Sequence, residues 1–138
     1  MDDDDYRLEE QVGHLMRRAQ QRHLSVFAAI IPELTTTQFA ALAKLAELGA
    51  MSQNALGRVT AMDAATIKGV VGRLVARRLV ATAPDGGDRR RLVVTLTPEG
   101  RELYDRVEPQ ALEASRLTLE PLAPEEREAF VGLLRKLT

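Results

Sequence analysis

Apolar residues recur at helical spacing along most of this chain. Over residues 6–31 they return every three or four positions, which predicts one long helix that Pro32 ends. A second apolar stripe follows Thr35 and Gln38, the residue types of a capping box, and this stripe stops at Gly49. The chain is therefore expected to begin with two helices joined by a short turn.

A shorter helix, a tight turn and a longer helix are predicted next. Ser52 is placed to cap a helix that ends near Val59, and residues 60–62 then form a turn that leads to Asp63. Asp63 is placed to cap a helix that runs to about Leu79. This order of elements is typical of a helix-turn-helix.

A β-hairpin is predicted directly after those helices. Two β-prone runs, residues 79–83 and 92–96, flank a sequence rich in turn formers that begins at Pro84. Gly86 and Gly87 are expected to supply the positive φ that a tight tip needs. Three arginines, residues 89–91, stand where the second strand leaves the tip. A hairpin in this position is typical of the wing of a winged-helix DNA-binding domain.

Two further helices complete the pattern. Thr97 followed by Pro98 is a strong start signal for a helix that runs to about Thr118, with a bend near Pro109. Residues 125–137 have the spacing of a last amphipathic helix. No internal repeat or linker is visible, so the sequence predicts one mostly helical α+β domain over residues 1–138.

Charge is distributed unevenly along the chain. The net charge of the 138 residues is −1, but residues 52–91 contain eight lysines and arginines against three acidic residues. That segment is therefore +5 and the remainder is −6. Such a polarity is expected when one face of a protein meets phosphate while the rest keeps it in solution.

The composition argues against several other classes of protein. The chain has no cysteine, so disulfides and thiolate zinc sites are excluded. No apolar run approaches the roughly 20 residues of a membrane span, and the acidic start of the chain is unlike a secretory signal. No catalytic-triad spacing or phosphate-binding loop is present. We expect a cytoplasmic protein that is not an enzyme and uses no metal or cofactor.

The predicted helix over residues 63–79 has an unusual outer face. Its inner face is expected to lie in the core and consists of Ile67, Val70, Val71, Leu74 and Val75. The opposite face carries small residues, with cationic or polar neighbours beside them: Ala65, Gly69, Gly72 and Ala76, flanked by Thr66, Lys68 and Arg73. Two interior glycines cost a helix roughly 1 kcal/mol each. We interpret them as a surface for close approach to a DNA groove; the alternative is helix–helix packing.

The charged residues of the hairpin have separate interpretations. Three adjacent arginines repel one another, and an anionic partner such as DNA would relieve that repulsion. Asp88 is expected to pair with Arg77 or Arg78 and so to hold the wing against the preceding helix. The alternative is that Asp88 serves only as a turn former.

The first predicted helix presents a candidate binding face for a small acid. His14, Arg17, Arg18 and Gln21 lie at helical spacing on one side, and a cationic face of this kind can bind a carboxylate. The alternative is that the arginines are solvated or pair with acidic groups across a dimer. His23 lies on the other side of the helix and is expected to be a satisfied core histidine, so the two histidines are not placed to share a metal.

The motifs together resemble those of the MarR family of multiple-antibiotic-resistance-type regulators. The resemblance rests on Ser52–Leu56, Asp63–Thr66, Arg73-Leu74, Leu79-Val80, Asp88-Arg89-Arg90 and Leu96–Gly100. It implies a winged helix-turn-helix at about residues 35–100 and dimerisation helices at about 6–31 and 98–138. It also implies a homodimeric repressor that binds a pseudo-palindromic site on double-stranded DNA and is released by a small, often aromatic, acid.

The resemblance also assigns roles to individual positions. Ala64, Thr66, Lys68 and Arg73 are expected to face the major groove, and Ser52 and Gln53 the DNA backbone. Arg90 is expected to enter the minor groove, with Arg89 and Arg91 on phosphates. The run Arg17–His23 is similar to that of family members that control nicotinate or hydroxynicotinate breakdown. Arg78 departs from the family, which usually has glycine there, so the helix end is expected to differ.

A second class of function remains open from the sequence. A winged helix can act as a protein-interaction module, in which case the wing arginines would contact an acidic partner instead of phosphate. Loss of DNA binding in Arg90→Ala would favour the regulator over the interaction module.

Overall fold

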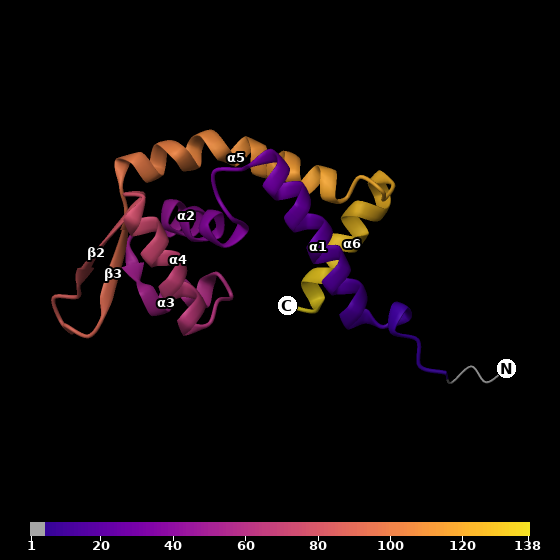
Figure 1. The fold of residues 1–138 in the computed structure, drawn as a ribbon, viewed down its shortest axis with the longest axis horizontal. Helices are drawn as coiled ribbons and strands as arrows, with labels where there is room; N and C mark the ends of the chain where they lie inside the picture. The colour runs from indigo at the N-terminus through magenta and orange to yellow at the C-terminus, as the bar shows by residue number, and fades with distance from the viewer. Residues whose placement is uncertain (1–4) are drawn as a thin grey trace.

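The computed structural model describes residues 5–138 as an elongated, mostly helical chain with a small sheet at one end (Figure 1). The helices are α1 (Val12–Ile30), α2 (Thr36–Leu48), α3 (Gln53–Val59), α4 (Ala64–Ala76), α5 (Pro98–Thr118) and α6 (Pro124–Lys136). The strands are β1 (Met51–Ser52), β2 (Val80–Pro84) and β3 (Leu92–Leu96). Helix α5 arches from the lobe formed by α2, α3, α4 and the hairpin to α1 and α6. The predicted α+β class and element order are confirmed.

The helix signals in the sequence act as expected. Thr35 accepts a hydrogen bond from the N–H of Gln38, and the Gln38 side chain accepts one from the N–H of Thr35, which completes the capping box. Ser52, Asp63 and Thr97 each accept from the N–H three residues onward. Local hydrogen bonding therefore sets the starts of α2, α3, α4 and α5.

The beginning of the chain differs from the prediction. The single helix expected over residues 6–31 is interrupted at Gln11, whose backbone is extended. A separate 3-10 turn, Leu8–Glu10, precedes that residue. The acidic residues 2–4 lie outside the part of the chain that the structure describes.

Helix α4 ends three residues earlier than predicted, at Ala76. Arg78 follows in the left-handed conformation, with φ of 62°. The N–H of Arg78 donates to the carbonyl of Val75, and that of Leu79 to the carbonyl of Leu74, which is the bonding of a Schellman end. The expectation that arginine would alter this helix end is therefore wrong, because Arg78 adopts the conformation that usually selects glycine.

The sheet has three antiparallel strands in the order β1-β3-β2. Strand β1 was not predicted; it pairs Met51 with Val94 and Ser52 with Val93, and so joins the start of α3 to the hairpin. Strand β2 begins one residue later than predicted and includes Pro84, opposite Leu92. The wing is thereby hydrogen-bonded to the helix-turn-helix through β1.

The hairpin tip does not use glycine with positive φ. Among the glycines of residues 5–138, only Gly49 has a positive φ. The positive φ predicted for Gly86 and Gly87 is therefore wrong. The side chain of Asp85 accepts from the N–H of Gly87, and the side chain of Asp88 accepts from the N–H of Arg90. The tip is therefore built by aspartate-bonded turns.

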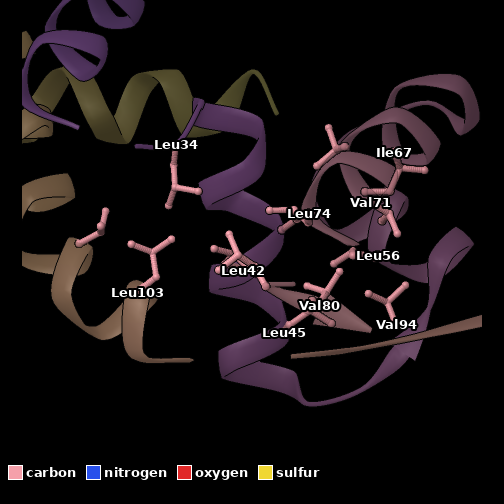
Figure 2. Close-up of a cluster of buried hydrophobic side chains, with 14 of the residues drawn as sticks. Leu34, Leu42, Leu45, Leu56, Ile67, Val71, Leu74, Val80, Val94 and Leu103 are labelled. Carbon is pink, nitrogen blue, oxygen red and sulfur yellow. The ribbon is translucent and has the colours of Figure 1, made fainter. Parts of the chain in front are cut away.

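The core lies inside the helix-turn-helix lobe and extends under α5. Figure 2 shows side chains from α2, α3, α4 and the sheet pointing toward one another, among them Leu42, Leu56, Leu74 and Val94. Ile67, Val70, Val71 and Leu74 are buried as predicted, but Val75 is 39% exposed. The inner face of α4 is thus narrower than its apolar pattern indicated.

The other end of the molecule keeps its apolar residues exposed. Helix α6 buries none of its side chains; Phe130 and Leu133 are exposed along it, and Leu137 is exposed directly after it. Leu8, Val12 and Leu15 near the start of the described chain are exposed as well. No helix within residues 5–138 is both long and apolar enough to cross a membrane.

Candidate nucleic-acid interface

Helix α4 turns a face of small and cationic residues outward. It is held on its inner side by buried Ile67 and Leu74 and at its start by the Asp63 cap. The outward face is exposed throughout and comprises Ala64, Ala65, Thr66, Lys68, Gly69, Gly72, Arg73 and Ala76. All of these positions except Ala64 were expected on the outer face or beside it from helical spacing, and Ala64 was expected at DNA from the family resemblance.

The two glycines of α4 face open space. A Cβ added at Gly72 would meet no atom within 4 Å, and one added at Gly69 would meet only the Arg73 guanidinium at 3.9 Å. Neither glycine therefore makes room for a neighbouring helix of the same chain. The helix-packing alternative has no support within the described chain, whereas a smooth outward surface is available to a partner.

The wing arginines have different surroundings. Arg89 and Arg90 are exposed, and the Arg90 guanidinium makes no hydrogen bond or ion pair with any residue of the range 5–138. Arg91 lies 4.0 Å from the Asp85 carboxylate and donates to the Ser52 hydroxyl at 3.4 Å. Arg91 therefore ties the wing to the start of α3, while Arg90 is left available.

A small polar hollow lies between the start of α3 and the wing. It has a volume of about 70 Å³ and is lined by Gln53, Asn54, Arg90, Arg91 and Leu92. Asn54 was not singled out from the sequence, because nothing local distinguishes an asparagine in a first helical turn. The hollow brings Gln53, expected to contact the DNA backbone, next to two of the wing arginines.

Ser52 has less freedom than its predicted role requires. Its side chain is 7% exposed, caps α3 through the N–H of Ala55 and accepts from Arg91. The hydroxyl is thus committed to internal contacts. Its contribution near the hollow is structural, because it holds Arg91 and the start of α3.

The predicted pairing of Asp88 with Arg77 or Arg78 is wrong. The Asp88 carboxylate accepts from the backbone of Arg90, as the turn-former alternative held. Arg77 instead donates from its guanidinium to the carbonyl of Glu33 at 2.6 Å. It joins the end of α4 to the loop between α1 and α2.

The acid at the start of α4 remains charged. Hydrogen bonds from the backbone and side chain of Thr66 lower the pKa of Asp63, and the carboxylate faces the positive end of the helix dipole. Beyond this cap, the outward face of α4 has only cationic charges, Lys68 and Arg73. The Asp63 cap therefore fixes the start of α4 and leaves the positive charge of the outward face in place.

The candidate acid-binding face on α1 is present but open. His14 is half-buried, and Arg17, Arg18 and Gln21 are exposed. None of the four side chains makes a hydrogen bond or ion pair with another residue between positions 5 and 138. His23, by contrast, lies 2.8 Å from the Thr118 hydroxyl through Nδ1 and tilts against Phe27. The side of α1 away from α5 is therefore the one with unused polar groups.

Known proteins match both the sequence and this architecture. Residues 33–91 match the MarR family model. The transcriptional repressor NicR of Pseudomonas putida is 46% identical over 99% of this chain and 88% of its own length. A probable transcriptional regulator from Pseudomonas aeruginosa is 48% identical, with a TM-score of 0.91 over 96% of this chain and 100% of that one.

A further solved structure is that of Bordetella bronchiseptica BpsR, whose DNA binding is regulated by 6-hydroxynicotinic acid. It is 47% identical, with a TM-score of 0.90 over 96% of each chain. The helix-turn-helix, the wing and the full length of the chain thus match proteins that regulate transcription. The chain belongs to the MarR family of winged helix-turn-helix transcriptional regulators.

Proposed function

We propose that this chain is a homodimeric transcriptional repressor that binds a pseudo-palindromic operator and is released by a small aromatic carboxylic acid. The observation that carries the proposal is the outward face of α4, where exposed glycine and alanine are flanked by Lys68 and Arg73. A surface without bulky side chains lets a helix lie deep in a major groove. The NicR and BpsR likenesses support the same function.

Individual roles follow from these positions. Ala64, Thr66, Lys68 and Arg73 face the bases of the major groove. Arg90 enters the minor groove, where negative potential favours a guanidinium. Arg89 and Arg91 neutralise phosphates, and Gln53 with the neighbouring Ser52 contacts the backbone beside them.

The exposed apolar residues support a dimer. Three large side chains at this end of the chain are at least 40% exposed: Phe130 and Leu133 in α6, and Leu137 directly after it. Val12 and Leu15 on α1 are also exposed. Water contact with so much apolar surface is unfavourable, and a second copy of the chain would cover it. Two wings and two α4 helices would then read two half-sites.

The effector site is proposed at His14, Arg17, Arg18 and Gln21. The arginines provide charge-assisted donors for a carboxylate, and they lie on the helix that joins the dimer region to α2. BpsR is regulated by 6-hydroxynicotinic acid, which makes this compound the natural first probe. A cytoplasmic location, with access to DNA, accompanies the proposed function.

Substitution of Arg90 tests the DNA-binding assignment. Arg90→Ala should weaken operator binding by about tenfold or more, because a minor-groove contact is lost while folding is unaffected. Fluorescence anisotropy gives the affinity and circular dichroism the fold. Arg116→Ala is the matched control, since Arg116 is an exposed arginine at the far end of α5. Unchanged DNA affinity in Arg90→Ala would contradict the assignment and favour the protein-interaction alternative.

Thermal shift tests the effector site. Saturating 6-hydroxynicotinate should raise the melting temperature of the wild-type protein by mass action, and it should lower operator affinity. Arg18→Ala should lose both responses, whereas Arg116→Ala should retain them. Equal responses in Arg18→Ala and the wild type would show that the acid binds elsewhere.

A further inference from the structure

Glu33 joins three elements that are far apart in the sequence. It lies in the loop between α1 and α2, and its carbonyl accepts the Arg77 guanidinium at the end of α4. Its carboxylate forms a 2.8 Å ion pair with Arg106 in the middle of α5. One loop residue therefore connects the end of the DNA-facing helix to the helix that leads into the dimer region.

The position of Glu33 is fixed although its side chain is exposed. Ile31 and Leu34, on either side of it, are 1% and 4% exposed and anchor the loop in the core. Arg106 precedes Val107, which is fully buried. The backbones on both sides of the ion pair are thus held, so the pair can transmit a constraint between them.

The ion pair lies at a weak turn of α5. Pro109 is inside this helix and has no N–H, so the carbonyl of Asp105 lacks its usual helical partner. Arg106 belongs to that same turn. Figure 1 shows α5 running from the hairpin past the α1–α2 loop toward α6. A change of angle at this turn would move the helix-turn-helix lobe relative to the dimer region.

The Glu33 carboxylate and the Arg106 guanidinium each stabilise the charged form of the other. The hydrogen bond from Arg106 lowers the pKa of Glu33, with Arg106 and Arg77 adding favourable charge, and the same bond raises the pKa of Arg106. The contact therefore persists through the neutral range. Because the pair is exposed, it contributes little to overall stability.

We propose that Glu33 is a positioning residue. It sets the angle between α4 and the C-terminal half of α5, which leads to the apolar surface of α1 and α6, and it thereby sets the distance between DNA half-sites that the dimer can bind. This inference rests on the proposed function. The contact with Arg77 fixes the end of α4 to the loop, and the contact with Arg106 braces α5 at the Pro109 turn. Neither contact is part of the DNA-facing surface itself.

The test measures affinity as a function of half-site spacing. The probe is a duplex that the wild-type protein selects from a random-sequence library, together with derivatives that gain or lose central base pairs one at a time. Each added pair moves the half-sites apart by about 3.4 Å and rotates one relative to the other. The variants are Glu33→Gln, Arg106→Gln and Arg106→Lys. Arg116→Gln is the matched control, because it removes an ion pair with Glu113 within α5 only.

Wild-type affinity should fall by about tenfold or more when one base pair is added or removed. Glu33→Gln and Arg106→Gln should flatten this dependence to about threefold, with normal dimer mass and nearly normal melting temperature. Arg106→Lys should retain much of the dependence, and Arg116→Gln all of it. Pro109→Ala, which restores the missing helical N–H, should partly restore the dependence in Arg106→Gln.

Two results would overturn the inference. One is an unchanged spacing dependence in Glu33→Gln and Arg106→Gln. The other is a uniform loss of affinity at every spacing, which would indicate direct contact with DNA or a folding defect. Failure of the wild-type protein to select any duplex would contradict the proposed function itself and is distinguishable from both.

Discussion

Arg78 shows how a single residue can keep a conformation that its side chain disfavours. It lies at the end of α4 with φ of 62°, and the Thr97 hydroxyl donates to its carbonyl. A left-handed conformation costs an L-residue roughly 1–2 kcal/mol. The buried residues on either side, Leu74 and Leu79, hold the chain in this turn.

Replacing Arg78 with glycine should therefore stabilise the protein. Arg78→Gly is expected to raise the free energy of unfolding by about 1 kcal/mol, less the entropy that glycine adds to the unfolded chain. Urea denaturation measures the change. Arg78→Ala is the control, because it removes the side chain and keeps the strain. A less stable Arg78→Gly would contradict the left-handed assignment.

Residue-level prediction worked where the chemistry was local. The caps at Thr35, Ser52 and Asp63 need only a side-chain oxygen and an N–H three residues onward, so sequence spacing sufficed. The partners of Arg77 and Asp88 could not be predicted in this way. Arg77 meets Glu33, which is far away in the sequence, and Asp88 is satisfied within its own turn.

Among the elements, α4 carries the clearest functional signal. Gly72 weakens the helix, yet a Cβ there would meet no atom of the described residues within 4 Å. No contact within residues 5–138 explains why this position lacks a side chain. The proposed close approach to DNA would account for it.

Gly72→Ala separates stability from function. The variant should gain about 0.5–1 kcal/mol of stability, because alanine is the better helix former. Its operator affinity should fall by about tenfold or more, since the new methyl group enters the groove. Gly13→Ala in α1 is the control, with open space around its glycine as well. Unchanged affinity in Gly72→Ala would show that α4 does not approach DNA closely at this position.

Strand β1 and the break at Gln11 could not be predicted from the spacing of apolar residues. β1 has only two residues and exists because β3 pairs with it across a long stretch of sequence. Gln11 has extended backbone within a run of apolar residues at helical spacing. Such spacing shows which side chains share a face, but it does not fix the backbone conformation of each residue. Gly100 was noted in the sequence only as part of a family motif. The structure gives the physical reason for glycine there, because a Cβ would overlap the carbonyl of Leu79.

At the scale of the whole molecule, the two ends have different surfaces. The lobe of α3, α4 and the wing carries the positive segment, whereas α1 and α6 expose apolar residues such as Leu15 and Leu133. The charge imbalance was visible in the sequence. The contacts of Glu33 with Arg77 and Arg106 were not, because they join residues that are far apart in the sequence.

An anisotropy titration at physiological salt tests sequence-specific DNA binding most directly. It compares a duplex selected by the protein with a scrambled duplex of the same composition. We expect two chains to bind each duplex, with an affinity for the selected site about a thousandfold tighter or more than for the scrambled one. Affinities that agree within a few-fold would contradict sequence-specific DNA binding, and with it the proposed function.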